Sequence, residues 1–134
     1  MNPRYLIVAE RACHRCEYCR APEKLFNISF EVEHIVPQVR QQSNDLTNLA
    51  LACRSCNLFK SDYTTGIDPI LQDEVKLFNP RQHLWDEHFQ VDLESGQIVG
   101  LTPEGRATVS RLQMNRSPQI SARLWWIQLG ILTR

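Results

Sequence analysis

Four cysteines constrain the fold of this chain more than any other feature. They form two Cys-x-x-Cys pairs, Cys16 with Cys19 and Cys53 with Cys56, and 33 residues separate the two pairs. Two such pairs can surround one tetrahedral zinc ion with four thiolates, and a site whose four positions are all filled by protein is structural. We therefore expect a small, loop-rich unit that folds around structural Zn²⁺, because the chain near the cysteines has little apolar core of its own.

A fifth cysteine complicates the choice of ligands. Cys13 and Cys16 form an equally spaced pair, so Cys13 competes with Cys19 for a place at the ion. We favour Cys13 as a small buried residue on the preceding helix. A catalytic role for Cys13 together with His14 is the weaker alternative, because no nearby residue would orient that pair.

Length and charge place few further limits on the protein. The chain has 134 residues, which suits one domain or a small domain with an extension. Its 15 basic and 15 acidic residues cancel, so no global field draws it to DNA or to membranes. Its longest apolar run is too short to cross a bilayer, and its start does not resemble a signal peptide. We expect a cytoplasmic protein with no membrane partner, in which cysteines serve as metal ligands or thiols.

Apolar periodicity and turn residues predict an α+β fold with two parts. In the first part, residues 1–66, we expect a helix at 7–15, a strand in which Phe26, Ile28, Phe30 and Val32 alternate with polar residues, a loop at 40–48, a short apolar segment at 49–53 and a helix that opens within 54–62. Thr64–Pro69 breaks this pattern. In the second part, residues 67–134, we expect a hairpin around Glu94-Ser95-Gly96 and helices that start at the Thr102-Pro103 and Ser117-Pro118 pairs.

The first part resembles a known family. The segments CEYC, EVEHIVPQ and NLALACRSCNLFK, taken in this order, are similar to those of the HNH endonucleases, and the resemblance covers about residues 11–62. It implies a small ββα-metal HNH nuclease unit, two strands and a helix around one metal ion, combined with the four-cysteine zinc site. The second part is similar to the extension of stand-alone bacterial HNH proteins, and we expect it to pack on the nuclease unit.

The resemblance also implies roles for individual residues. His34 matches the histidine that activates water, and Glu33 and Asn57 match the residues that hold a divalent ion. Asn48 matches the asparagine that holds the active-site loop, and Lys60 matches a lysine that adds positive charge near the phosphate. Two positions depart from the commoner pattern, because Asn57 replaces a third histidine and Glu33 stands where aspartate is more frequent.

The chemistry of these residue types agrees with phosphodiester hydrolysis. A neutral imidazole can accept a proton from water near physiological pH. Oxygen ligands from a carboxylate and an amide suit Mg²⁺ or Mn²⁺. The sequence therefore predicts a metal-dependent HNH endonuclease that cuts DNA. The alternative is a non-catalytic zinc-binding module that binds nucleic acid or protein.

The end of the chain is rich in arginine. Residues 105–134 contain five arginines and no acidic residue, whereas residues 67–104 have a net charge of −6 from eight acidic and two basic residues. We expect Ile120, Leu124 and Ile127 to pack on the nuclease unit, so that the arginines face the DNA backbone. In the alternative, the arginines pair with acidic residues of the middle segment within the chain.

Overall fold

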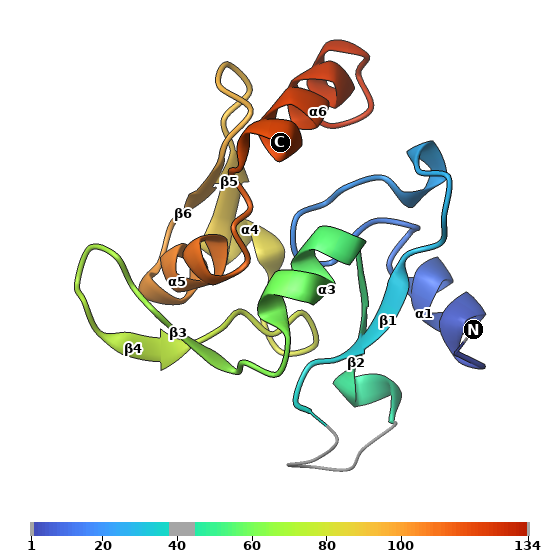
Figure 1. Cartoon of the computed structure of the whole chain (residues 1–134), viewed down its shortest axis with the longest axis horizontal. Coiled ribbons are helices and arrows are strands. Elements are labelled where there is room, and N and C mark those ends of the chain that lie inside the picture. The colour runs from blue at the N-terminus through green and yellow to red at the C-terminus, as the bar shows by residue number, and fades with distance from the viewer. Residues whose placement is uncertain (1, 38–44, 134) are drawn as a thin grey trace. The chain divides into compact units, whose positions relative to one another are not determined.

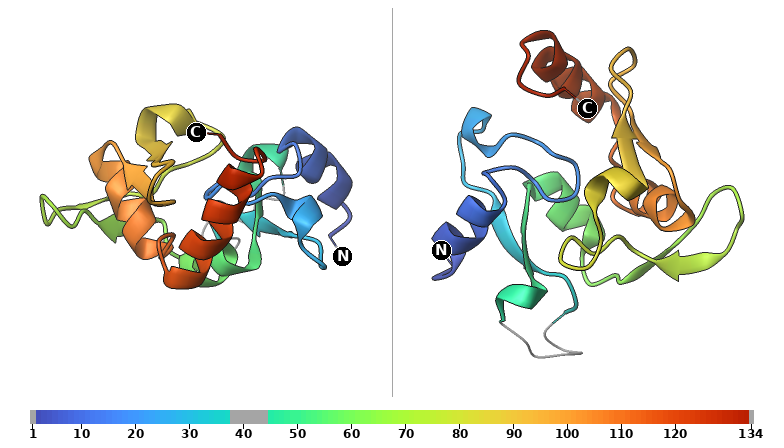
Figure 2. Two further views of the ribbon diagram at one scale, coloured as in Figure 1. Left: turned by 90° about the horizontal axis from the view of Figure 1, so that it is seen from above. Right: turned by 180° about the vertical axis from the view of Figure 1, so that it is seen from behind.

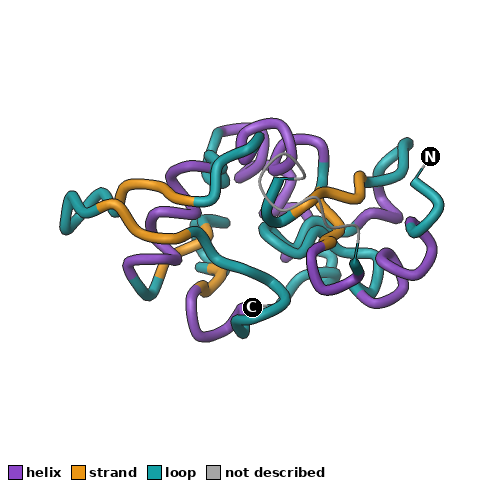
Figure 3. The backbone as a smooth tube through the Cα atoms, turned by 90° about the horizontal axis from the view of Figure 1, so that it is seen from below, coloured by secondary structure: helices purple, strands orange, loops and turns teal. Residues whose placement is uncertain are grey.

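The protein folds into two compact units. The computed structural model describes residues 2–37 and 45–133. The first unit comprises Met1–Thr64 together with Asn79–His83, and the second comprises Thr65–Phe78 and Leu84–Arg134. The chain therefore leaves the first unit, enters the second, and returns to the first for five residues. Figure 3 shows that short strands and helices alternate with loops throughout.

The first unit is built on one hairpin. Its elements, in chain order, are α1 (Tyr5–Arg11), η1 (Glu23–Leu25), β1 (Glu31–His34), η2 (Leu46–Asn48), β2 (Leu49–Ala52) and α3 (Arg54–Lys60). Strands β1 and β2 pair antiparallel, with Glu31 opposite Ala52 and His34 opposite Leu49. Helices α1 and α3 both contact this hairpin and lie on opposite sides of it (Figures 1 and 2). The arrangement of β1, β2 and α3 confirms the predicted ββα unit.

The covered hairpin explains the short apolar run at 49–52. All four residues of β2 are buried. A strand that is covered on both faces reads as a continuous apolar segment rather than an alternating one. The remaining core of this unit is small and is completed by Val8, Ala9, Phe30 and Ile35.

Two boundaries in the first unit differ from the sequence prediction. The strand begins at Glu31, and Phe26 and Ile28 are exposed, because β2 offers only four residues for pairing. Phe26 packs edge-on against Phe30, with their ring centroids 4.8 Å apart, so this alternation reflects aromatic packing rather than strand pairing. Helix α1 spans Tyr5–Arg11 rather than 7–15.

Helix α1 ends in a left-handed turn. Cys13 and His14 both have φ of 54°, a left-handed conformation that ends the helix before Arg15.

The loop predicted at 40–48 is described from Asp45 onward, where Leu46–Asn48 forms a 3-10 turn. Residues 40–44 lie outside the described part of the chain.

The second unit contains two hairpins and two longer helices. Its elements are β3 (Thr65–Ile67), β4 (Glu74–Lys76), α4 (Trp85–His88), β5 (Phe89–Val91), β6 (Ile98–Gly100), α5 (Pro103–Arg111) and α6 (Ser117–Gln128). The β5–β6 hairpin and the Thr102 cap of α5 confirm the prediction, since the Thr102 hydroxyl accepts the Gly105 N–H at 3.0 Å. Helix α5 packs along β6 and β3 (Figure 1). No helix in the described ranges is long and apolar enough to span a bilayer.

Helix α6 is held within the second unit by a buried arginine. Ile120 and Ile127 are only half-buried and Leu124 is exposed, whereas Arg123 is 1 % exposed. The Arg123 guanidinium donates to the Gly96 carbonyl at 2.7 Å and to the Met114 carbonyl at 2.9 Å. A buried arginine therefore ties α6 to the β5–β6 turn, against which Leu124 also lies at Gly96. The packing of the apolar stripe on the nuclease unit stays a prediction.

A second tail arginine also binds within its own unit. The Arg106 guanidinium donates from Nε to Asp68 Oδ1 at 2.9 Å and from Nη2 to Asp68 Oδ2 at 2.7 Å. Asp68 is fully buried, and this two-point contact lowers its pKa to about 2. For Arg106, the structure thus supports the intramolecular alternative rather than the contact with DNA.

The Asp68–Arg106 pair gives a pH-dependent prediction. A carboxyl whose pKa is lowered by folding stabilises the protein above its ordinary pKa of about 3.9, and that contribution is lost as the pH falls toward the lowered value. We expect Asp68→Asn to lower the unfolding temperature of the second unit at pH 5, and this difference from the wild type to shrink as the pH approaches about 2. Thermal unfolding followed by circular dichroism measures it.

The exposed Arg116 provides the control for this experiment. Arg116→Gln is expected to leave the unfolding temperature at pH 5 close to that of the wild type. A difference between Asp68→Asn and the wild type that stays constant from pH 5 to pH 2 would contradict a stabilising ionised Asp68.

Candidate functional site

The four cysteines of the two predicted pairs come together in the first unit. Cys16 and Cys19 lie in the loop after α1, Cys53 caps the N-terminus of α3, and Cys56 lies in its first turn. All four are buried and reduced, and their sulfur atoms lie within 4.8 Å of one another. The Cys16 sulfur accepts the Cys19 N–H, and the Cys53 sulfur accepts the Cys56 N–H, each at 3.4 Å. These N–H groups stabilise negative charge on the sulfurs.

The spacing of the sulfurs suits a tetrahedral metal ion. Zn–S bonds of about 2.3 Å place two sulfurs of a tetrahedron about 3.8 Å apart. The Cys19 and Cys53 sulfurs, one from each pair, are 3.7 Å apart. The cluster can therefore bind a metal ion with four protein ligands, as predicted.

Cys13 does not belong to this cluster. It is exposed and lies in the turn after α1. The expectation that it is a buried helical residue is therefore wrong, and the reason is the left-handed turn that ends α1 at this point. The sulfur atoms that gather are those of Cys16, Cys19, Cys53 and Cys56.

A row of polar residues on α3 faces a row of acids on β1. Arg54, Asn57 and Lys60 are three residues apart, so they share one face of the helix. Glu31 and Glu33 are two residues apart, so they share one face of the strand. Arg54 and Asn57 contact Glu31, whereas Lys60 contacts Glu33. The two rows therefore pair in register, one acid with each end of the helix.

Glu33 is buried and both of its oxygens are bound by protein groups. The Tyr18 hydroxyl donates to Oε1, and the Lys60 ammonium lies 3.1 Å from Oε2. Burial raises the pKa of Glu33, and the charge of Lys60 and the hydrogen bond from Tyr18 oppose that rise. Burial and the neighbouring carboxylate raise the pKa of Tyr18 well above its ordinary value. The three side chains form a closed, charge-balanced cluster.

Lys60 is held in an all-oxygen environment. It is 1 % exposed, and besides Glu33 its ammonium donates to the Ile35 carbonyl at 2.9 Å and approaches the His34 carbonyl at 3.4 Å. Lys60 therefore fixes the backbone at the end of β1. Its charge is enclosed at this position rather than presented at the surface.

Glu31 has more accessible partners. The Asn57 side-chain amide donates to Glu31 Oε2, and Arg54 lies 3.3 Å from Oε1. The Arg54 side chain is 77 % exposed and the Glu31 side chain 36 %. An exposed ion pair of this kind stabilises a protein by only about 0–1 kcal/mol.

His34 and Asn48 lie at the end of the hairpin. His34 is the last residue of β1, half-buried, and lies on the opposite face from Glu33 because successive strand residues alternate. The Asn48 side chain accepts the Val36 N–H at 3.0 Å and donates to the Val36 carbonyl at 2.9 Å. Asn48 thus holds the chain two residues beyond His34.

The predicted residues are therefore gathered in part. Glu33 and Lys60 contact each other, and the His34 carbonyl lies near Lys60. Asn57 contacts Glu31 rather than Glu33. Sequence reasoning did not assign roles to Glu31 and Tyr18, although the repeat of Glu31 and Glu33 on one strand face was a readable signal for the first of them.

A further pair supports the cysteine loop. Glu17, between Cys16 and Cys19, accepts the Leu51 N–H at 2.9 Å and forms an ion pair with Arg81. Arg81 belongs to the short segment that returns to the first unit. No local pattern could have shown this contact, because the two residues are far apart in the chain.

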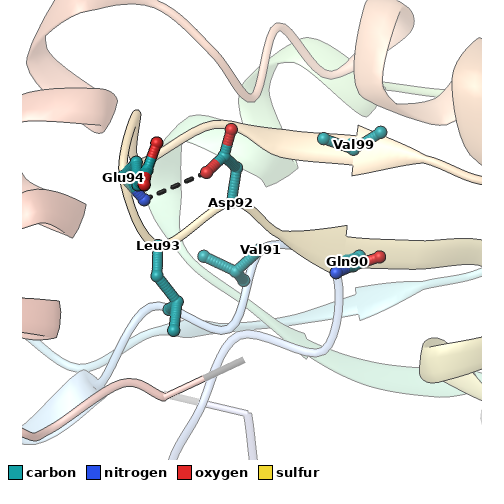
Figure 4. Close-up of a pocket in the computed structure, with 6 residues that line it drawn as sticks. All are labelled: Gln90, Val91, Asp92, Leu93, Glu94 and Val99. Atoms are coloured by element: carbon teal, nitrogen blue, oxygen red, sulfur yellow. Dashed lines mark hydrogen bonds between the residues drawn. The ribbon is translucent and has the colours of Figure 1, made fainter.

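The second unit has a hollow at the β5–β6 hairpin. Its volume is about 410 Å³, and it is lined by Gln90, Val91, Asp92, Leu93, Glu94 and Val99 (Figure 4). The Asp92 carboxylate accepts the Glu94 N–H at 3.0 Å, and the hydrogen bonds of the turn lower its pKa. Asp92 therefore closes the turn, and this hollow holds no acid–base pair among its lining residues.

Comparisons with known proteins agree with the geometry of the first unit. Residues 16–62 match the family model described as HNH endonuclease. No curated protein and no solved structure matches the chain. The matched segment contains β1, β2, α3 and all four clustered cysteines. Residues 16–62 are therefore an HNH endonuclease domain.

Proposed function

We propose that this protein is a metal-dependent endonuclease that hydrolyses phosphodiester bonds of DNA. The observation that carries the proposal is the ββα unit within the matched segment, which ends its first strand at His34 and is braced by the four-cysteine cluster. A reducing compartment such as the cytoplasm keeps the four thiols available for a metal ion. We propose Zn²⁺ as the ion of this cluster.

In this proposal His34 is the general base. A histidine side chain takes a proton from water near neutral pH, and the hydroxide equivalent attacks the phosphorus atom. The P–O bond to the 3′ oxygen breaks, and this leaving oxygen takes a proton from solvent water. Asn48 is the positioning residue, because its two hydrogen bonds to Val36 hold the chain that follows His34. Lys60 also positions this segment through the Ile35 carbonyl.

The residues that the resemblance assigns to the divalent ion are Glu33 and Asn57, and the contacts of Glu33 decide whether it can bind one. The resemblance places Mg²⁺ or Mn²⁺ between Glu33 and Asn57. Both Glu33 oxygens already bind Tyr18 and Lys60, and a divalent cation there would meet the Lys60 ammonium. Glu33 as arranged does not fit an ion, and the Asn57 side chain contacts Glu31 rather than Glu33. No catalytic step is therefore assigned to an ion at Glu33.

A plasmid-nicking assay tests the proposed activity. The wild-type protein, isolated with its zinc, is expected to convert supercoiled plasmid to open circles when Mg²⁺ or Mn²⁺ is added. His34→Ala is expected to slow nicking by about 10²–10⁴-fold, the usual contribution of a general base. EDTA under conditions that leave the zinc bound is expected to stop it.

Two controls accompany the assay. His88→Ala, which changes a histidine of the second unit, should retain nicking. Zinc content and circular dichroism of His34→Ala should equal those of the wild type, so that lost activity is not lost folding. Nicking by His34→Ala at the wild-type rate would refute the role of His34.

One observation favours a second function. The Glu33 oxygens are both satisfied within the protein, as a non-catalytic zinc module that binds nucleic acid or protein would allow. Such a protein would bind DNA or a protein partner and would nick nothing at any concentration of Mg²⁺ or Mn²⁺. The same assay, run beside a DNA-binding titration, separates the two functions.

A further inference from the structure

We propose that two adjoining hollows beside β1 bind the backbone of a DNA strand, and that His14 and Lys24 hold one of its phosphate groups. This inference rests on the proposed function in one respect, namely that DNA is the ligand. It concerns a phosphate away from the one that is cut, and residues to which neither the sequence nor the family match gives a role.

The first step is a buried carboxylate that fixes the position of a histidine. Glu23 is 5 % exposed. Its oxygens accept hydrogen bonds of 2.7 Å from the Tyr5 hydroxyl, His14 Nδ1 and the Phe30 N–H. Burial raises the pKa of Glu23, but these hydrogen bonds outweigh burial and lower it, so the carboxylate is ionised. Glu23 therefore holds the His14 ring in place between α1 and the start of β1.

The second step is the nitrogen of His14 that a ligand can reach. Because Nδ1 donates to Glu23, a ligand meets the ring at Nε2. The His14 side chain is 30 % exposed, so the ring is accessible from solvent. A protonated histidine is a donor at both nitrogens, so Nε2 can donate to an anion while Nδ1 still donates to Glu23.

The third step is the chemistry of the hollow that His14 borders. Its volume is about 310 Å³, and most of its other lining residues are hydrogen-bond donors or apolar side chains: Tyr5, Lys24, Phe26, Asn27, Ile28 and Ser29. Lysine, amide and hydroxyl groups are the side chains that bind the phosphates of DNA. Phe26 and Ile28 offer apolar surface to the sugar. The lining thus suits a sugar-phosphate backbone.

The charges of the hollows also favour an anion. Glu23 is enclosed by its three donors, and Glu31, in the second hollow, forms an ion pair with Arg54. Lys24 is exposed, so its charge faces solvent. A phosphate group therefore meets cationic and neutral donors at the place where His14 and Lys24 lie.

The fourth step is that the second hollow leads to the strand that ends in His34. Its volume is about 420 Å³; it shares Tyr5 and Ser29 with the first hollow, and its other lining residues are Asn2, Phe30, Glu31 and Val32. Val32 and His34 are two residues apart, so they share one face of β1.

The length of this path fits a DNA strand. Residues 30 to 34 span about 13 Å, and one strand of DNA carries a phosphate about every 3.4 Å along the helix axis. A strand whose scissile phosphate lies at His34 can therefore run along β1 and place a phosphate about four positions away, or further, at His14 and Lys24. This continuity with His34 is why we assign the hollows to DNA rather than to an acidic peptide.

The test measures binding of a short labelled DNA duplex to the zinc-loaded full chain by fluorescence anisotropy, without Mg²⁺ or Mn²⁺. The salt concentration is varied at pH 6, below the ordinary histidine pKa of about 6.5. Lys24→Gln is expected to weaken binding about three- to tenfold and to reduce the log–log salt slope by about 0.9, the contribution of one phosphate contact. His14→Gln, which keeps an N–H donor for Glu23, is expected to act in the same direction.

A matched lysine variant provides the control. Lys76→Gln removes the same charge from an exposed lysine of the second unit and is expected to keep the wild-type affinity and salt slope. Zinc content and circular dichroism of Lys24→Gln should equal those of the wild type. If His14→Gln fails to fold, the exposed Lys24 decides the test by itself. An equal loss of affinity in Lys76→Gln and Lys24→Gln overturns the inference.

Two further titrations identify the source of the anion. Inorganic phosphate tests a site for free phosphate, and polyglutamate tests a site for an acidic protein. Binding of either one that Lys24→Gln abolishes, with DNA binding unchanged, overturns the assignment to a DNA strand.

The outcomes separate this inference from the proposed function. In the nicking assay, Lys24→Gln is expected to raise KM and leave kcat unchanged, because a distant contact binds substrate and transition state equally. Weaker DNA binding in both variants of a protein that nicks nothing supports the inference and refutes the nuclease. Nicking by a protein whose DNA affinity and salt slope ignore both variants does the reverse. A wild-type protein that binds no DNA also overturns the inference.

Discussion

Cys53→Ser is expected to release the metal ion from the four-cysteine cluster and to unfold the first unit. Cys53 is both a ligand and the N-cap of α3, and its sulfur accepts the Cys56 N–H. Structural zinc contributes ~10–16 kcal/mol to the folding of small modules, which exceeds what the small core of this unit can replace. The loss of one of four ligands should therefore remove most of the cooperative unfolding transition of the unit.

Metal analysis and circular dichroism measure this result. Purified wild-type protein should contain one zinc ion per chain. Cys53→Ser should contain none, and it should lose the part of the circular-dichroism signal that comes from the first unit. Cys13→Ser is the matched control, because Cys13 is exposed and lies outside the cluster, so it should keep both zinc and fold. Zinc loss in Cys13→Ser together with zinc retention in Cys19→Ser would show that the ligand set is wrong.

Lys60→Met is expected to destabilise the first unit by about 3–5 kcal/mol, the usual cost when one partner of a buried ion pair is removed. The side chains of Lys60 and Glu33 are both almost fully buried, so the remaining carboxylate would stay uncompensated away from water. The Ile35 carbonyl would lose its donor as well. Chemical denaturation of the zinc-loaded protein measures the change in the free energy of unfolding.

The double variant Glu33→Gln/Lys60→Met tests the cause of this loss. A neutral glutamine can still accept the Tyr18 hydroxyl, and no buried charge remains. We expect the double variant to be more stable than Lys60→Met alone. Equal stability of the two variants would mean that Lys60 acts through packing or through the carbonyls, and not through the charge of Glu33.

The features that could be predicted from the sequence are those set by residues close together in the chain. The four cysteines could be identified because a tetrahedral ion needs two short pairs, and this requirement leaves a fixed spacing in the chain. The α5 start at Thr102-Pro103 could be identified because a hydroxyl cap and a proline suit adjacent positions at a helix N-terminus. Neither inference depends on contacts between residues that are far apart in the sequence.

The contacts that could not be predicted from the sequence depend on how distant elements align with one another. The acid that meets Asn57 is decided by where α3 crosses β1, and a shift of two strand positions separates Glu31 from Glu33. Arg123 is another example, because its helix carries apolar residues around it and yet buries the arginine. Two of its partners, the Gly96 and Met114 carbonyls, are backbone groups, which no side-chain pattern encodes.

The return of Asn79–His83 to the first unit has a consequence for where this unit can be cut out of the chain. The family match ends at residue 62, but Arg81, which pairs with Glu17 between Cys16 and Cys19, lies beyond it. A gene fragment cut at residue 62 or 66 would leave the Glu17 carboxylate without this arginine, and the cysteine loop without its brace. A fragment that keeps the Glu17–Arg81 pair must therefore extend through residue 83, and it then also contains β3 and β4 of the second unit.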